Sequence, residues 1–403
     1  MDLTYGEEYD VFREEVRAFL GRHWPPSGSG ERPTADEVAA FRDLATEHGF
    51  LRRSIPRRYG GSEQPPDVIE GAILREEFRR VRAPMDPSGV GTMMLVPTLL
   101  DRGAEWQKDK FVRPTMRGEM IWCQGYSEPG AGSDLASIST RGELVGDEWV
   151  INGQKVWTSG AHASDWMFCL VRTEPDAPKH AGISYLLIEM NQPGIEVKPL
   201  RQMTGAADFN EVFFTDVRTP KDHIVGERGQ GWQVSRTTLK HERNWIGAAT
   251  QTTKLFEGLV QLASTTSRGG RRNIEDPAVR RRLVEIEGYV RAHEYSSYRQ
   301  LTKNAKGEDP GIIQQMNKLS STNIGQRVAA LALDLLGDGG LLDATGIERD
   351  GQRPTNERSW ITHYMYTLAG AIAGGTANIQ RNLIAERGLG LPRDVHLQKD
   401  AAR

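Results

Sequence analysis

The chain is short of cysteine and of aromatic residues, and neither sign of charge is in clear excess. Only two of its 403 residues are cysteines, Cys123 and Cys169, and neither belongs to a CxxC unit. The sequence therefore predicts neither a disulfide framework nor a cysteine-based zinc site, and it fits a reducing, intracellular setting. Lys plus Arg total 51 against 54 for Asp plus Glu, a formal charge of -3 that attracts neither a phosphate backbone nor an anionic membrane. We expect no nucleic-acid partner.

Long apolar runs and targeting signals are missing as well. The best candidate for a membrane span, residues 368–376, is short and interrupted by glycine, so no membrane insertion is expected. Residues 1–16 are acidic and amphipathic, and they lack the basic and apolar regions of a signal peptide. These features predict a cytoplasmic protein.

Several chemistry-bearing motifs can be excluded by their spacing. None of the nine histidines forms an HExxH arrangement, so no metal site is expected. The segment 125–129, GYSEP, resembles a hydrolase nucleophile elbow around Ser127, but Pro129 stands where that motif needs glycine. The segment 226–231, GERGQG, lacks the GxGxxG spacing of a nicotinamide-binding fold.

Hydrophobic periodicity divides the chain into three parts. Residues 1–119 and 233–403 carry apolar residues at helical spacing, whereas residues 120–232 alternate with a period of two. Within this middle part, Asn152-Gly153 lies between alternating runs and predicts a hairpin turn. We expect an α+β protein with an N-terminal helical domain (1–119), a middle antiparallel β-barrel or sandwich (120–232) and a C-terminal four-helix bundle (233–403) whose first helical segment covers 232–263.

Five segments in order resemble the acyl-CoA dehydrogenase family over essentially the whole chain. They are YSEPGAGSD at 126–134, INGQKVWTS at 151–159, LRQMTG at 200–205 with NEVFFTDVRTP at 210–220, GERGQGW at 226–232, and GGTANIQRNLIAER at 374–387. The resemblance implies an enzyme that uses FAD to oxidise an acyl-CoA to its trans-2-enoyl-CoA and passes electrons to an electron-transfer flavoprotein. It implies a homo-oligomer, dimer or tetramer, or a heterotetramer with a related chain.

The resemblance also assigns candidate site residues. The resemblance implies that Trp157 packs on the flavin ring and that the Ser159 hydroxyl bonds its reactive edge. A Trp-x-Ser spacing in a strand points both side chains to one face. The alternative for Trp157 is a buried core residue. Ser133 and Arg243 are assigned to substrate. The complete set of predicted cofactor contacts is Gln124, Tyr126, Ser127, Trp157, Ser159, Arg268, Gly337, Thr376 and Asn378.

The glycine-containing loop at 126–134 also fits this role on physical grounds. Gly130 and Gly132 allow backbone N–H groups to approach an anionic pyrophosphate or a carbonyl oxygen, and Ser127 and Ser133 offer short hydroxyl donors. The alternative is a purely structural turn. In either case Glu128 and Asp134 are expected to organise the loop rather than to catalyse.

Two departures from the family pattern bear on mechanism. Gly374 occupies the place where most well-known members carry the catalytic glutamate, and the segment around Arg268 is shortened and lacks the phenylalanine that usually follows. Some members instead place the base in a Glu-Arg pair on the first C-terminal helix, about three helical turns after its opening glycine. Glu242 and Arg243 have that spacing from Gly231, so Glu242 is the predicted base. A solvent-exposed helical glutamate is the alternative.

Two other functions share this architecture. A flavin-dependent monooxygenase would need no carboxylate base, and a non-catalytic subunit would bind FAD or CoA beside an active partner. A DNA-binding member of the superfamily also exists, but the charge of -3 weighs against that function.

Overall fold

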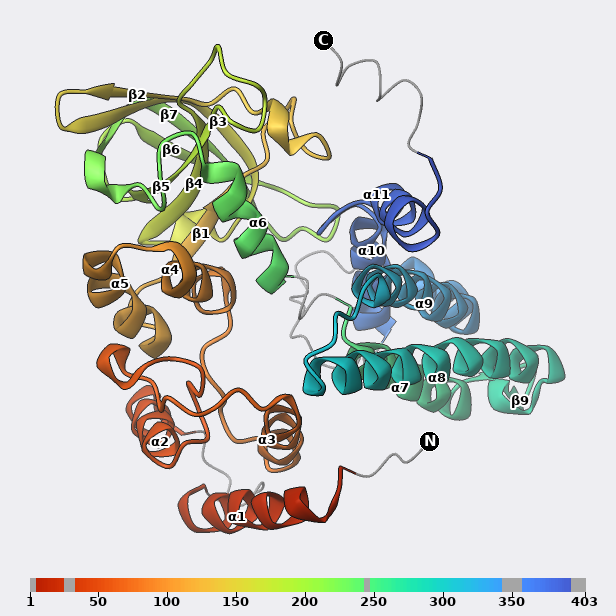
Figure 1. The fold of residues 1–403 in the computed structure, drawn as a ribbon. Helices are drawn as coiled ribbons and strands as arrows, with labels where there is room; N and C mark the ends of the chain where they lie inside the picture. The colour runs from red at the N-terminus through yellow and green to blue at the C-terminus, as the bar shows by residue number, and fades with distance from the viewer. Residues whose placement is uncertain (1–4, 25–32, 243–246, 343–356, 393–403) are drawn as a thin grey trace. The chain divides into compact units, whose positions relative to one another are not determined.

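The computed structural model describes residues 5–24, 33–242, 247–342 and 357–392 (Figure 1). The chain forms two compact units. The sheet unit contains Met1–Lys198 and Phe209–His241, and the helix unit contains Pro199–Asp208 and Glu242–Arg403. The predicted domain limit near 119 falls between α5 (Glu105–Arg117) and β1 (Trp122–Gly125), and the limit near 232 falls in the first turn of α6 (Gly231–Glu242). Both limits stay predictions.

Five helices open the sheet unit, and local capping explains where two of them begin. Thr34 and Glu37 form a capping box at the start of one, and the Asp67 carboxylate accepts the N–H groups of Ile69 and Glu70 at the start of another. The five are α1 (Glu7–His23), α2 (Ala35–Glu47), α3 (Val68–Arg80), α4 (Val96–Arg102) and α5 (Glu105–Arg117).

The predicted apolar stripe of α1 is buried. Val16, Phe19 and Leu20 are at most 3% exposed and belong to one cluster with Phe41 of α2 and Phe78 of α3. Because the three helices bury their apolar faces against one another, they form a small core of their own.

A curled, mixed sheet follows, and α6 (Gly231–Glu242) comes directly after it (Figure 1). The strand order is β1-β4-β2-β3-β7-β6, with β5 paired to β4; β1 lies parallel to β4, while β3 pairs antiparallel with β2 and β7. The chain after β7 then lies along β5, where the Val225 N–H donates to the Tyr185 carbonyl at 2.8 Å. The strands are β1 (Trp122–Gly125), β2 (Arg141–Val145), β3 (Glu148–Ser159), β4 (Trp166–Arg172), β5 (Ile183–Glu189), β6 (Ile195–Leu200) and β7 (Phe209–Pro220).

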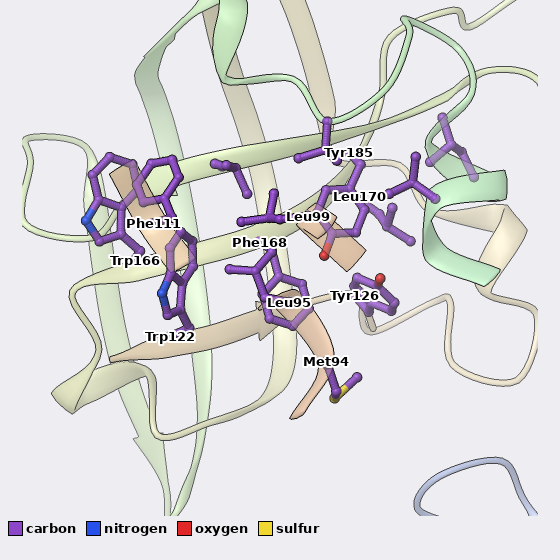
Figure 2. Packing of buried hydrophobic residues seen from close by; sticks show 14 of the residues in the cluster. Met94, Leu95, Leu99, Phe111, Trp122, Tyr126, Trp166, Phe168, Leu170 and Tyr185 are labelled. Carbon is purple, nitrogen blue, oxygen red and sulfur yellow. The ribbon is translucent and has the colours of Figure 1, made fainter. Parts of the chain in front are cut away.

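Both faces of the central strands are buried. Along β4, Trp166, Phe168 and Leu170 belong to a cluster shared with residues of α4, α5 and α6, whereas Met167 and Cys169 face a second cluster inside the curl. Figure 2 shows the first cluster around Phe168 and Leu170. β4 and β5 therefore depart from the alternation predicted for residues 120–232 and are continuous apolar runs, because both of their faces are buried.

The predicted hairpin at Asn152-Gly153 is wrong. Both residues lie inside β3, and the turn joining β2 to β3 is Gly146-Asp147, where Gly146 has φ 65°. A Cβ at position 153 would lie 2.7 Å from the Cα of Thr140, so glycine at this position permits close approach of two backbones rather than a turn.

The helix unit contains the helices that follow α6 and a short hairpin whose two strands have two residues each. Its core includes Leu259, Leu283, Val328 and Trp360, each at most 5% exposed. The predicted single helical segment 232–263 is wrong, because α6 ends at Glu242, Gly247 has φ 87°, and a separate helix begins at Ala249. The elements are α7 (Ala249–Thr265), β8 (Ser267–Arg268), β9 (Arg271–Arg272), α8 (Pro277–Ala305), α9 (Ile313–Leu336), α10 (Glu357–Gly370) and α11 (Ala377–Leu383).

The order of helices, a curled middle sheet and helices again confirms the predicted fold class. The sheet is mixed in detail, since two of its pairings are parallel. Among the described residues, no helix combines the length and the apolarity that crossing a bilayer requires.

Candidate active site

The glycine-containing loop leaves β1 and presents its small residues at the surface. Glu128 and Ala131 exchange both backbone hydrogen bonds at 3.0 Å, which folds the loop tightly on itself. Gly130, Gly132 and Ser133 are exposed beyond this turn. Within the described part of the chain, the Ser133 side chain makes no hydrogen bond, so its hydroxyl is available to a ligand.

Trp157 and Ser159 lie at the end of β3, and both side chains are open to solvent. Trp157 is 62% exposed and Ser159 is exposed, whereas Thr158 between them is buried. Trp157 is therefore no core residue. Its indole meets the Phe209 ring edge-on, with centroids 6.0 Å apart. An exposed indole beside an exposed hydroxyl suits a planar, polar-edged ring system.

A β-bulge sets the direction of the Trp157 side chain. Between the pairs Lys155–Val212 and Thr158–Asn210, three steps along β3 match two along β7. The extra residue gives Trp157 a φ of 62°, a left-handed conformation that is costly for a side chain of this size. Such strained residues are concentrated at functional sites.

A buried ion pair lies directly behind the bulge. Lys155 Nζ is 2.8 Å from Glu128 Oε1, and neither side chain is more than 4% exposed. Burial raises the pKa of Glu128, but Lys155 and the N–H of Ser139 outweigh it and hold that pKa at about 2. Lys155 was not among the predicted site residues. It lies at the same alternate positions of β3 as Trp149 and Ile151, whose side chains are buried. This period-two alternation is the sequence feature that could have indicated a buried Lys155.

Three predicted cofactor contacts, on β1 and just after it, are half-buried or buried. Gln124 is half-buried and lies opposite Phe168 in the sheet. The ring of Tyr126 belongs to the core cluster in Figure 2, and the residue as a whole is 5% exposed. Ser127 is half-buried, and its carbonyl accepts the Val156 N–H at 2.9 Å.

The predicted base closes α6. Glu242 has a helical backbone, but its side chain and the whole of Arg243 lie outside the described residues. One turn earlier, Thr238 Oγ1 lies 3.0 Å from Thr98 Oγ1 and 3.5 Å from the Tyr185 hydroxyl. These buried hydroxyls fix α6 against α4 and β5. Burial raises the pKa of Tyr185, which therefore stays neutral.

The helix unit presents the closing motif at α11. The Thr376 hydroxyl caps this helix by accepting the Ile379 N–H at 3.2 Å, and Asn378 is exposed. Gly374, in the place where most well-known family members have the base, is exposed with φ 61°. The roles predicted for Thr376 and Asn378 stay predictions.

Two further predicted cofactor contacts, Arg268 and Gly337, lie at turns. Arg268 stands at the end of the β8–β9 hairpin, which turns through Gly269 and Gly270 at φ 60° and 79°. This tight hairpin is the shortened segment noted in the sequence. Arg268 is exposed and pairs with no carboxylate in the described residues. Gly337 follows α9 directly, with φ 55°.

Comparison with known proteins identifies the family. The profile described as acyl-CoA dehydrogenase, N-terminal domain, matches residues 6–119, the middle-domain profile matches 123–217, and the C-terminal-domain profile matches 229–389. The chain belongs to the acyl-CoA dehydrogenase family, whose members are flavoproteins and generally depend on FAD. It is thus an oxidoreductase of the acyl-CoA dehydrogenase type.

Individual relatives cover nearly the whole chain. Acyl-CoA dehydrogenase IpdE1 of Mycobacterium tuberculosis is 38% identical over 401 residues, which are 96% of this chain and 99% of that protein. The ChsE4-ChsE5 complex of Mycobacterium tuberculosis has a chain with a TM-score of 0.76 at 26% identity, covering 98% of this chain and all of the other. The Tcur3481-Tcur3483 steroid ACAD gives a TM-score of 0.76 at 28% identity, again over 98% of this chain and all of the other.

Proposed function

We propose that this protein is an FAD-dependent dehydrogenase that converts an acyl-CoA thioester to the trans-2-enoyl-CoA and passes the electrons to an electron-transfer flavoprotein. The observation that carries the proposal is the strained bulge of β3, which presents the exposed Trp157 beside the exposed Ser159. Nothing in the packing of the sheet requires a large indole at φ 62° on an open face.

The described residues fit the cofactor. When bound, FAD supplies the acceptor for the hydride that leaves the substrate β-carbon. Trp157 would cover one face of the ring, the Ser159 hydroxyl would donate to its edge, and the exposed loop at Gly130 and Gly132 would approach a phosphate or carbonyl oxygen. The further predicted contacts of the cofactor are Gln124, Tyr126, Ser127, Thr376 and Asn378, and Arg268 and Gly337 are predicted to contact the cofactor of a neighbouring subunit.

Glu242 is the proposed base that takes the proton from the substrate α-carbon. Its place at the end of α6 follows a helix turn locked by Thr238, which limits how far the end of α6 can shift. Arg243 and Ser133 are the proposed substrate contacts. Gly374 has no side chain, so the more usual base position offers no competing carboxylate.

The proposed substrate is a bulky, steroid-derived acyl-CoA. Support comes from the likeness to a structure described as a steroid ACAD. Assembly with a related chain as a heterotetramer is supported by the likeness to a structure named as the ChsE4-ChsE5 complex and to one whose name joins Tcur3481 and Tcur3483. A homo-oligomer is the simpler form of the same proposal. We place this chemistry in the cytoplasm.

The proposal is tested by anaerobic flavin bleaching. The purified protein, alone and with its co-expressed related chain, is loaded with FAD and mixed with straight-chain, branched and steroid side-chain acyl-CoA esters. We expect bleaching with the steroid-type esters. Glu242→Gln should keep FAD and bind the ester but lose flavin reduction by about 10²–10⁴, the usual effect of removing a general base. Bleaching of this variant at the wild-type rate would remove Glu242 from the mechanism.

A second candidate function is a non-catalytic subunit, which the likeness to two-chain complexes favours. It predicts that Glu242→Gln leaves bleaching by the co-purified pair unchanged, while the equivalent change in the partner abolishes it.

Fast reoxidation of the reduced flavin by air would instead indicate a monooxygenase.

A further inference from the structure

We infer that the buried Lys155–Glu128 ion pair is a positioning element, which holds the bulge that carries Trp157 and the glycine-containing loop in the one arrangement that receives the flavin. This inference rests on the proposed function. It assigns no chemistry to either residue, and it gives the pair a role that is separate from general stability.

Three contacts join the loop to β3 at this point. Lys155 Nζ donates to Glu128 Oε1 at 2.8 Å and to the Tyr126 carbonyl at 3.2 Å. The Val156 N–H donates to the Ser127 carbonyl at 2.9 Å. Consecutive residues of β3 are therefore bonded to consecutive residues of the loop, directly before the bulge begins.

Glu128 is held from its other side as well. The Ser139 N–H and hydroxyl donate to Oε2 at 2.6 and 2.9 Å, and the Thr140 N–H donates to Oε1 at 2.9 Å. The residues just before β2 thus bind the same carboxylate as Lys155 of β3. Because its pKa is held at about 2, Glu128 stays ionised and is unsuited to proton transfer near neutral pH.

The bulge needs support on both sides. A regular strand would place the residue at 157 in extended conformation, and a large side chain at φ 62° persists only where its surroundings over-determine it. On the far side, Asn210 Nδ2 donates to the Thr158 carbonyl at 2.9 Å. On the near side, Lys155 is anchored by Glu128. Between these two anchors the chain has little freedom to relax.

The energetics separate positioning from stability. A fully buried ion pair loses most of its electrostatic gain to desolvation, and neutral residues of similar shape often replace it without loss of stability. Removing one partner alone is different, because it leaves a charge buried and unpaired. A neutral double replacement therefore removes the positioning contact while leaving no uncompensated charge.

The test uses the full chain with Lys155→Met and Glu128→Gln combined. We expect Tm of the apo-protein to change by a few degrees only, while the Kd for added FAD rises roughly ten- to a hundredfold through misplacement of the contacting groups. The visible circular dichroism of the bound flavin should change with it. Amide hydrogen exchange at Val156 should become faster, since its bond to Ser127 loses the neighbouring anchor.

A matched control comes from the N-terminal helices, where the Glu77 carboxylate is 2% exposed and pairs with Arg13. Glu77→Gln with Arg13→Met should alter Tm without altering the Kd for FAD. Glu128→Asp keeps the charge but has a shorter side chain, so it should weaken FAD binding to an intermediate degree. This variant replaces the double variant in the test if the double variant fails to fold.

The outcomes are distinguishable. If the wild type takes up FAD and the Lys155/Glu128 variants bind it with wild-type Kd and dichroism, the positioning role is overturned and the proposed function stands. If the wild type takes up no FAD, the proposed function fails. In that case the amide exchange rate at Val156 still tests whether the ion pair holds the end of β3. An exchange rate in the double variant equal to that of the wild type would overturn this role of the pair.

Discussion

His293 Nε2 lies 2.9 Å from the carbonyl oxygen of Gly247, so the imidazole joins α8 to a residue two positions before the start of α7. Because a carbonyl only accepts, Nε2 must carry the hydrogen. The other ring nitrogen, Nδ1, is 3.0 Å from Thr252 Oγ1. Burial lowers the pKa of His293, partly offset by the bond to Gly247. The neutral imidazole therefore fixes the start of α7.

This depressed pKa predicts an acid-sensitive helix unit. The unfolded chain binds the proton more readily than the folded one, so the stability from a neutral His293 is present above the ordinary histidine pKa of about 6.5 and is lost as pH falls below it. His293→Gln keeps an amide donor but cannot titrate. We expect urea midpoints of the variant to fall less between pH 7 and pH 5 than those of wild type. The exposed His180→Gln is the control, and equal slopes for His293→Gln and wild type would contradict the prediction.

Trp157→Gly should separate stability from function. Glycine adopts a φ of 62° without strain, and the replaced indole is 62% exposed, so little packing is lost. We expect the apo-protein to unfold at an equal or higher Tm, with a gain of up to about 1 kcal/mol. FAD affinity should fall at the same time, measured by fluorescence titration. A fall in Tm of several degrees would mean that the indole is part of the structural core.

Two glycines on the same hairpin should respond in opposite ways. A Cβ at Gly153 would lie 2.7 Å from the Thr140 Cα, whereas a Cβ at Gly146 meets nothing within 4 Å. Gly153→Ala should therefore destabilise the protein by about 1–3 kcal/mol through overpacking. Gly146→Asn should cost less than about 1 kcal/mol, since asparagine tolerates left-handed turn positions. Denaturant unfolding of the two variants checks the order, and equal losses would refute it.

Glu77 should be the acid-labile centre of the N-terminal helices. Desolvation raises the pKa of this buried carboxylate, but Arg17, Arg13 and Arg80 outweigh it and lower that pKa to about 2. Its contribution is present above its ordinary pKa of 4.5 and is lost as pH falls toward 2. Glu77→Gln should cost about 1–3 kcal/mol at pH 7 and much less at pH 3. A loss that is independent of pH would show that the charge is unimportant.

The sequence by itself determined the order of helices, sheet and helices, because periods of 3.6 and 2 are properties of neighbouring residues. It also singled out Trp157 and Ser159 from the segment 151–159, and both are exposed, although the bulge sets the direction of Trp157. The base at Glu242 came from spacing within one helix, and it stays a prediction. These inferences depend on residues close together in the chain and not on tertiary contacts between distant segments.

Only the tertiary structure decided the features that depend on contacts between segments far apart in the chain. Asn152-Gly153 has the chemistry of a turn, but pairing with β7 on both sides and close contact with Thr140 keep it inside β3. Lys155 is a long cationic side chain that a sequence places in solvent, and only the returning loop buries it against Glu128. In each case contacts between residues far apart in the chain outweigh the local preference.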